Sequence, residues 1–289
     1  MNGILLIDKP SGWTSSDVVA KLRGVLHERR IGHSGTLDPM ATGLLVVFVG
    51  RATRAVEFAE AHEKQYLSGL RLGLVTDTQD VTGTPIGGEK QDVSQTALEA
   101  VLDRFRGEIS QIPPMYSAVK VGGRKLYEIA RRGGEVERRP RRVTISELQL
   151  QGREGEDWSL SVTCSKGTYI RTLCHDIGAA LGCGGCMSSL RRMRAGAFTL
   201  ETAHTLEEVQ RAADQGEAEA LLLPTDSLFA EYPPLSLGTG DERRVRNGSS
   251  VPVAGQEGTY RVYNHQGEFL ALAFVSKDEL KTIKSFFEV

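Results

Sequence analysis

The sequence lacks the features that would point to a membrane or secreted protein. No apolar stretch approaches the roughly 20 residues that a membrane-spanning helix needs. The first residues, MNGILLIDKPSGW, have no basic segment ahead of the apolar ones, and Asp8 and Lys9 come early, unlike in a signal peptide. We therefore expect a cytoplasmic protein. At 289 residues, with 40% hydrophobic and 25% charged residues, the chain is expected to form one large soluble domain and one small one.

Cysteine is scarce, with only Cys164, Cys174, Cys183 and Cys186 in the chain. Without a signal peptide, these residues are expected to be free thiols rather than disulfides. The spacing of Cys183 and Cys186 is typical of half a zinc site, but no second close pair accompanies them, which disfavours zinc. The acidic turn over residues 76–80 is compatible with a magnesium site, and ordinary turn chemistry explains it as well.

Strong net charge is also lacking, since the formal net charge is −2. Residues 120–142, which we call the basic segment, are an exception, because nine basic and three acidic residues leave a local excess of +6. Such a segment can neutralise several phosphates of a nucleic acid, although a solvated loop can have the same composition. Glycine pairs at 122–123 and 133–134 are candidate hinges. The basic residues are Lys120, Arg124, Lys125, Arg131, Arg132, Arg138, Arg139, Arg141 and Arg142.

Residues 35–45, GTLDPMATGLL, place one carboxylate among small, apolar and turn residues. Pro39 pushes Asp38 towards extended backbone angles, while Gly35 and Gly43 permit tight turns or the close approach of another backbone. The apolar run over 44–49 is typical of a buried strand. Asp38 is therefore a candidate nucleophile, general base or metal ligand on a rigid loop. The alternative is a turn aspartate that hydrogen-bonds to its own backbone.

Periodicity predicts the main elements around this loop. Thr14 and Asp17 form a capping box at the start of a helix, and Ser94 is expected to cap another. In a strand over 64–72, Tyr66 shares a face with Ser68 and alternate leucines. A probable domain boundary lies at the prolines of 232–234. Further strands are predicted over 4–7, 143–150, 158–164, 260–263 and 269–275, and further helices over about 169–181 and 204–223.

Four sequence blocks, in this order, resemble motifs of the TruB family of tRNA pseudouridine-55 synthases: KPSGWTS, GTLDPMATGLL, PPMYSAVKVGGRKLYEIAR and KGTYIRTLCHDIG. The last part, with RNGSSVPV and GEFLALA, resembles a PUA domain, a small RNA-binding β-barrel, more weakly. The resemblance implies an α+β fold with a mostly antiparallel curved sheet flanked by helices over residues 1–230. It also implies a basic RNA-binding loop at about 114–142 and a PUA-like barrel over 231–289.

The resemblance implies that uridine 55 in the T-arm of tRNA is isomerised to pseudouridine after the base has been flipped out of the stack. Asp38 would be the nucleophile, attacking the sugar or the uracil ring, and Arg171 would keep it ionised. Tyr66 would stack on the base and could take the C5 proton. The reaction involves no redox change, so no cofactor or metal is expected. The expected partner is tRNA, and the protein is expected to be a monomer.

The resemblance also implies RNA-binding positions besides the basic segment. His33 would hold the RNA where the base has left the stack, and Leu190 would lie beside the target base. Tyr169, Arg191 and Arg192 are expected near the site, while Lys9 is expected mainly to brace the active-site loop. Two other functions stay open: an RNA-binding protein without catalysis, and a hydrolase with an aspartate nucleophile. The hydrolase would need a second acid, which the Asp38 motif lacks.

Overall fold

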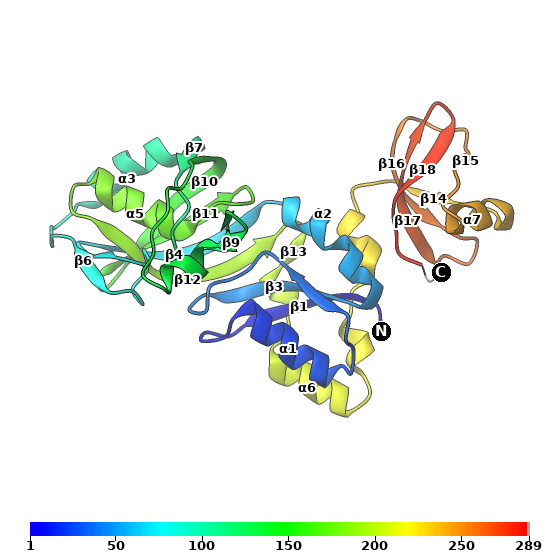
Figure 1. Ribbon diagram of the computed structural model, residues 1–289, viewed down its shortest axis with the longest axis horizontal. Helices are drawn as coiled ribbons and strands as arrows, with labels where there is room; N and C mark the ends of the chain where they lie inside the picture. The colour runs from blue at the N-terminus through cyan, green and yellow to red at the C-terminus, as the bar shows by residue number, and fades with distance from the viewer. Residues whose placement is uncertain (288–289) are drawn as a thin grey trace.

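The computed structural model describes residues 1–287, and its main sheet runs through the larger part of an elongated molecule (Figure 1). Within these residues the sheet has nine strands, in the order β1-β3-β12-β4-β11-β10-β7, with β2 beside β3 and β13 beside β12. The pairing is antiparallel except between β3 and β12, which confirms a mostly antiparallel sheet. The strands are β1 Gly3–Lys9, β2 Ile31–Ser34, β3 Thr42–Val49, β4 Lys64–Leu72, β7 Gly107–Gln111, β10 Arg141–Glu154, β11 Asp157–Cys164, β12 Gly185–Ala195 and β13 Phe198–Thr199.

The strand that follows the Asp38 loop is buried on both faces, as its unbroken apolar sequence predicts. Leu44, Val46 and Phe48 of β3 pack on one side, in a cluster that includes Phe229 of the 3₁₀ turn Thr225–Phe229. Leu45 and its alternate neighbours pack on the other side against helices α1 (Ser15–Val25) and α6 (Leu206–Asp214). A loop that leads into such a strand has a firm anchor at its carboxyl end.

Helices cover the sheet in two groups (Figure 1). One group consists of α1 and α6. The other consists of α3 (Gln95–Leu102) and α5 (Ile170–Ala180), which pack on β4, β10, β11 and β12 around a second core. The short helix α2 (Val56–Ala61) follows β3. Both predicted caps are confirmed: Thr14 and Asp17 form the capping box of α1, and Ser94 accepts a hydrogen bond from the amide of Ala97. The helix predicted over 204–223 is shorter, because α6 ends at Asp214 and only a 3₁₀ turn follows at Ala218–Leu221.

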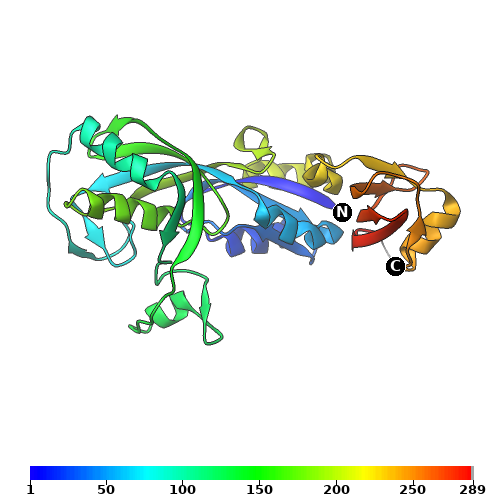
Figure 2. The ribbon, with the colours of Figure 1, turned by 90° about the horizontal axis from the view of Figure 1, so that it is seen from above.

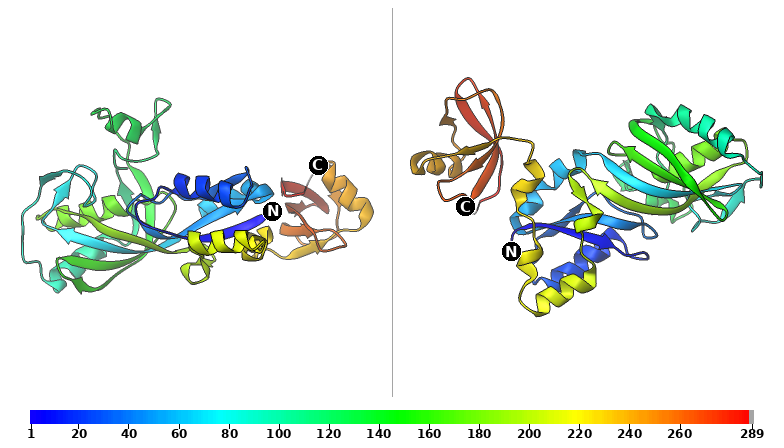
Figure 3. Two further views of the ribbon diagram at one scale, coloured as in Figure 1. Left: turned by 90° about the horizontal axis from the view of Figure 1, so that it is seen from below. Right: turned by 180° about the vertical axis from the view of Figure 1, so that it is seen from behind.

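The basic segment projects from the sheet body, as Figures 2 and 3 show. It holds a small hairpin of β8 (Lys120–Val121) and β9 (Arg124–Lys125), followed by helix α4 (Leu126–Ala130). Gly122 and Gly123, with φ of 57° and 82°, form the two-residue turn of this hairpin. Such left-handed angles favour glycine, so this pair forms a tight turn, and its role as a hinge stays a prediction. A second small hairpin, β5 (Val75–Thr76) and β6 (Pro85–Gly87), lies at the far end of the body.

The last part of the chain forms a separate five-stranded sheet in the order β14-β16-β17-β18-β15, with helix α7 (Thr239–Arg246) beside it. The elements predicted over 260–263 and 269–275 are confirmed as parts of β16 and β17, whereas α7 and three strands escaped prediction. An aromatic cluster of Phe58, Phe229, Phe269 and Phe286 joins this sheet to the body. The strands are β14 Pro234–Ser236, β15 Val251–Pro252, β16 Gly258–Tyr263, β17 Phe269–Ser276 and β18 Glu279–Ser285.

The four cysteines are buried free thiols, as expected. Across residues 1–287, no group of three or more His, Cys, Asp or Glu side chains is arranged to hold a metal ion. None of the helices in this part of the chain has the length and apolar character needed to cross a membrane.

Candidate active site

Asp38 lies on the loop between β2 and β3, and two buried residues of the same loop anchor it in the core. Leu37 and Ala41 are buried in the same cluster as α5 and β4, and the amide of Ala41 donates to the carbonyl of Asp38 at 3.0 Å. Gly43 has a φ of 96°, and a Cβ atom there would lie 2.4 Å from the carbonyl oxygen of Arg192. The sequence-based prediction that Gly43 allows a second backbone to approach is therefore confirmed.

Arg171, in the first turn of α5, forms a bidentate ion pair with the Asp38 carboxylate. Its Nε lies 2.9 Å from Asp38 Oδ2, and its Nη2 donates to Oδ1 at 3.1 Å. The Arg171 side chain is 6% exposed, whereas the Asp38 side chain is 34% exposed. This fork geometry fixes the orientation of a carboxylate, and it leaves Asp38 partly exposed.

The same guanidinium also binds two further segments of the chain. Nη2 donates to the carbonyl of Tyr116 at 2.8 Å, at the foot of the basic segment. Nη1 donates to the carbonyl of Thr78 at 3.2 Å and lies 3.7 Å from Asp80 Oδ2. Arg171 is therefore the point where the Asp38 loop, the acidic turn and the foot of the basic segment meet.

Asp80 was not among the predicted site residues, and the structure places it in the site. Its side chain is 7% exposed, and its Oδ1 accepts hydrogen bonds from Thr78 Oγ1 at 2.9 Å and from the amide of Thr82 at 3.0 Å. The turn chemistry suspected from the sequence is present, but it also serves to aim Oδ2 at Arg171. The only hint in the sequence is that Asp80 has a threonine two residues before it and another two residues after it, Thr78 and Thr82.

The electrostatics of Asp38 differ from the expectation that Arg171 sets its pKa. Burial raises the pKa of Asp38, the charge of Arg171 lowers it, and the charge of Asp80 raises it further, so that the net direction is upward. Arg171 therefore offsets only part of the cost of placing a carboxylate in this loop. It also holds the carboxylate in one orientation through two nitrogens.

Tyr66, on β4, packs against the core beneath the Asp38 loop, on the face that the alternation predicts. Leu190 of β12 belongs to the same core and is also buried. Burial raises the pKa of the Tyr66 phenol, and the nearby guanidinium of Arg192 opposes this rise. The phenol therefore keeps its proton at neutral pH, and its ring lies close enough to Asp38 for that charge to raise the pKa as well.

Three buried cations lie behind the loop. Arg192 is 1% exposed and donates to the carbonyls of Leu44 at 2.6 Å and Gly35 at 2.9 Å. Lys9 donates to the carbonyl of Pro39 at 3.3 Å, and burial lowers its pKa to about 8. Lys64 is also buried, with a pKa lowered to about 8. The prediction that Arg192 contacts RNA is wrong, because its side chain lies in the interior and fastens both ends of the loop.

Comparison with known proteins agrees with this geometry. The model for the TruB family pseudouridylate synthase, N-terminal domain, matches residues 23–170, and the model for the tRNA pseudouridylate synthase B C-terminal domain matches residues 171–230. A tRNA pseudouridine synthase B from Pseudomonas fluorescens (strain Pf0-1) is 44% identical over 283 residues, which cover 96% of this chain and 93% of that protein. The chain belongs to the TruB family. It is therefore a pseudouridine synthase, an isomerase.

Two further comparisons support the TruB assignment. A tRNA pseudouridine synthase B from Azoarcus sp. (strain BH72) is 46% identical over 265 residues, covering 91% of this chain and 88% of that protein. A solved structure, described as the crystal structure of a Cbf5-Nop10-Gar1 complex, matches with a TM-score of 0.76 and 28% identity. That match covers 99% of this chain and 85% of the other one. The fold therefore matches along nearly the whole TruB chain.

The remaining predicted positions differ in burial and in their partners in this TruB structure. His33 is half-buried on β2, and its Nδ1 atom is buried without a hydrogen-bond partner among the described residues. Tyr169 is fixed in front of α5 by Gln111, which bonds to its amide at 3.0 Å and to its carbonyl at 3.3 Å. Arg191 is half-buried and is paired with Asp8 at 2.7 Å. Most basic residues of the segment are exposed.

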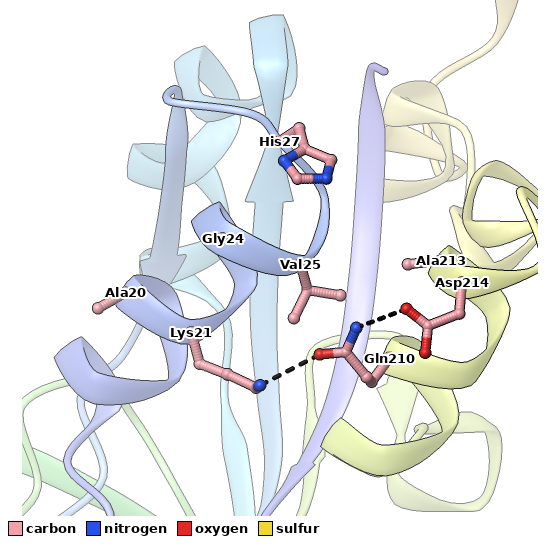
Figure 4. A pocket seen from close by; sticks show the side chains of 8 residues that line it. All are labelled: Ala20, Lys21, Gly24, Val25, His27, Gln210, Ala213 and Asp214. Atoms are coloured by element: carbon pink, nitrogen blue, oxygen red, sulfur yellow. Dashed lines mark hydrogen bonds between the residues drawn. The ribbon is translucent and has the colours of Figure 1, made fainter.

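A hollow of about 380 Å³ lies elsewhere, in the seam between α1 and α6 (Figure 4). Lys21 Nζ donates to Gln210 Oε1 at 3.1 Å, and Gln210 Nε2 donates to Asp214 at 2.9 Å across its floor. The hollow lies towards the carboxyl end of α1, whereas the other end of that helix, at Ser15, contacts Leu37. It therefore takes no part in the site around Asp38.

Proposed function

We propose that this enzyme converts uridine 55 in the T-arm of tRNA to pseudouridine, with Asp38 as its nucleophile. The observation that carries the proposal is the partly exposed Asp38 carboxylate, which Arg171 holds in a bidentate ion pair. The Tyr66 phenol lies close enough to feel the charge of this carboxylate. A fixed, ionised oxygen that faces solvent is what a covalent step at a sugar or a pyrimidine ring requires.

In the proposed reaction the N1–C1′ bond of the target nucleotide breaks and a C5–C1′ bond forms. The base is flipped out of the RNA before this, since neither atom is accessible in a stacked arm. Asp38 attacks the sugar or the ring while Arg171 holds it in position. The bond that Asp38 forms breaks again before the product leaves, which restores the carboxylate. Tyr66 stacks on the flipped base, with Leu190 at its side. The C5 proton leaves directly or through water, and N1 gains a proton, so that the isomerisation balances without a cofactor or a metal.

The RNA is proposed to lie across the face that carries Asp38. The basic segment contacts phosphates, while His33, Tyr169 and Arg191 hold the nucleotides near the flipped base. The second sheet, with residues 231–289, is proposed to be a PUA-like RNA-binding unit. We further propose that the enzyme acts as a monomer in the cytoplasm.

The hydrolase alternative would need a second acid to protonate a leaving group. Asp80 is a second carboxylate that contacts Arg171, but its oxygens are occupied by Thr78, Thr82 and Arg171. An acid so engaged and so deeply buried is poorly suited to donate a proton to a leaving group. The isomerase proposal needs no such donor.

Carbodiimide labelling of tRNA after incubation with the purified enzyme tests the proposal. Wild type is expected to create one label at uridine 55 with no change in RNA mass, whereas Asp38→Asn is expected to create none and to bind tRNA nearly normally. Asp214→Asn, on the exposed face of α6, is the matched control and should retain full activity. Release of free uracil would identify a hydrolase, and binding without labelling by wild type would identify a non-catalytic RNA-binding protein. Turnover by Asp38→Asn would overturn the nucleophile assignment.

A further inference from the structure

Residues 9–15 run alongside the Asp38 loop, and hydrogen bonds fasten the two segments on both sides of Asp38. On one side, the amide of Gly12 donates to the carbonyl of Pro39 at 2.8 Å. On the other side, the amide of Leu37 donates to Ser15 Oγ at 2.9 Å, and this hydroxyl lies 3.3 Å from the Leu37 carbonyl. Trp13 stands between these two anchors, as Asp38 does in the facing segment.

A buried ammonium group, that of Lys9, links the backbone of Trp13 to the Asp38 loop. Lys9 Nζ donates to the carbonyl of Trp13 at 2.6 Å and also to the carbonyl of Pro39 at 3.3 Å. Lys9 itself is fully buried, so this bridge is protected from competition by water. The backbone of Trp13 is therefore held in a fixed position relative to the Asp38 loop.

The side chain of Trp13, in contrast, is left open. It is 36% exposed, whereas the other tryptophan, Trp158, is buried in the core. Among residues 1–287, no aromatic ring or cation packs against the indole of Trp13. Because the backbone is already fixed, contact between the indole and another flat ring costs only the rotamer freedom of the Trp13 side chain.

We propose that Trp13 is a stacking platform for an unpaired base of the substrate RNA, next to the uridine that faces Asp38. The proposal rests on the proposed function, in which one base leaves the stack and exposes the faces of its neighbours. Unpaired bases stack readily on aromatic side chains, and every base offers such a face. Trp13 therefore adds affinity at the catalytic loop without selecting a sequence.

Tryptophan fluorescence tests this directly, because the chain has only two tryptophans and one is buried. The protein is used as the Asp38→Asn variant, so that the RNA stays unmodified, and it is titrated with a T-arm hairpin RNA. Stacking is expected to quench the emission in a saturable way, and adding Trp13→Phe should abolish the quenching. Adding Trp13→Ala should weaken binding about 5- to 150-fold, the range for loss of one base–aromatic stack.

Leu67→Ala is the matched control. Leu67 is 38% exposed and neighbours Tyr66 in β4, but alternation turns it to the opposite face of the sheet. Its removal should leave both the affinity and the quenching unchanged. A thermal melt of each variant checks the fold, and if Trp13→Ala fails to fold, the comparison with Trp13→Phe still decides the question.

Emission that stays unchanged at saturating RNA, or a folded Trp13→Ala variant that binds as tightly as its parent, would overturn the proposal. Labelling of uridine by wild type is measured in parallel. If wild type modifies the RNA and no quenching occurs, only the role of Trp13 fails. If wild type binds the RNA without modifying it, the proposed function fails, and the quenching still reports whether Trp13 stacks.

Discussion

Replacing Arg139, Arg141 and Arg142 with Gln should flatten the salt dependence of tRNA binding. All three side chains are exposed where the basic segment rejoins β10. Arg142 is paired with Glu108 at 3.1 Å, but both partners are so exposed that the pair is easily exchanged for a phosphate. Arg138 is left intact, because it donates to the carbonyl of Pro113 at 3.2 Å and links the end of the segment to the chain that precedes it.

The size of the effect follows from counterion release. Each phosphate contact contributes roughly 0.7–0.9 to the slope of log affinity against log salt concentration. Three lost contacts reduce the slope by about 2.1–2.7. Between 50 and 200 mM salt, wild type should therefore lose about 20- to 40-fold more affinity than the triple variant. Stability should barely change, since Leu126, the buried anchor of α4, is untouched and surface substitutions rarely exceed about 0.5 kcal/mol.

The assay is a titration of tRNA affinity at several salt concentrations, with a thermal melt of each protein. Arg211→Gln, an exposed arginine on α6, controls for loss of positive charge as such. Equal slopes for wild type and the triple variant, with unchanged melting, would refute the reasoning. The basic segment would then be a solvated loop, and the phosphate contacts would have to lie elsewhere.

Two further predictions concern the reacting groups. Tyr66→Phe keeps the ring and removes the hydroxyl. If the hydroxyl relays the C5 proton, single-turnover rates should fall steeply while the affinity for tRNA stays nearly constant. A rate equal to that of wild type would leave Tyr66 only a stacking role. Asp80→Asn and Arg171→Gln should move the acid limb of the pH–rate profile in opposite directions. The charge of Asp80 raises the pKa of Asp38 and that of Arg171 lowers it, so the limb should shift to lower pH in the first variant and to higher pH in the second. Shifts in the same direction would contradict this electrostatic account.

The features predictable from the sequence are those with a local cause. The unbroken apolar run of β3 reflects burial on both faces, and the caps at Thr14 and Ser94 depend on neighbours three residues away. The strands β14 and β15 carry too little pattern, since they have only three and two residues. The link between Asp80 and Arg171 joins residues far apart in the chain, and no periodicity encodes it.

Arg192 shows how composition misled the prediction. Within SSLRRMR it resembles a surface cation, and no strand was predicted there. In β12, however, Arg192 lies two residues after Leu190, so the alternation of a strand turns both towards the interior. Recognition of the strand would have placed the guanidinium behind the loop of Asp38. Its charge is tolerated there because backbone carbonyls at Leu44 and Gly35 accept its hydrogen bonds.

The position of β12 between β3 and β4 has a consequence for how the protein is made. These two strands are neighbours in the sequence, but the strand that joins them in the sheet is synthesised much later. A nascent chain that ends after β11 has no partner for one edge of β4, and its Asp38 loop lacks both Arg171 and Arg192. Catalytic competence therefore arrives late and abruptly during synthesis, and the long-range pairing that delivers it makes folding slow. Until then, the unpaired edge of β4 is open to pairing with other chains.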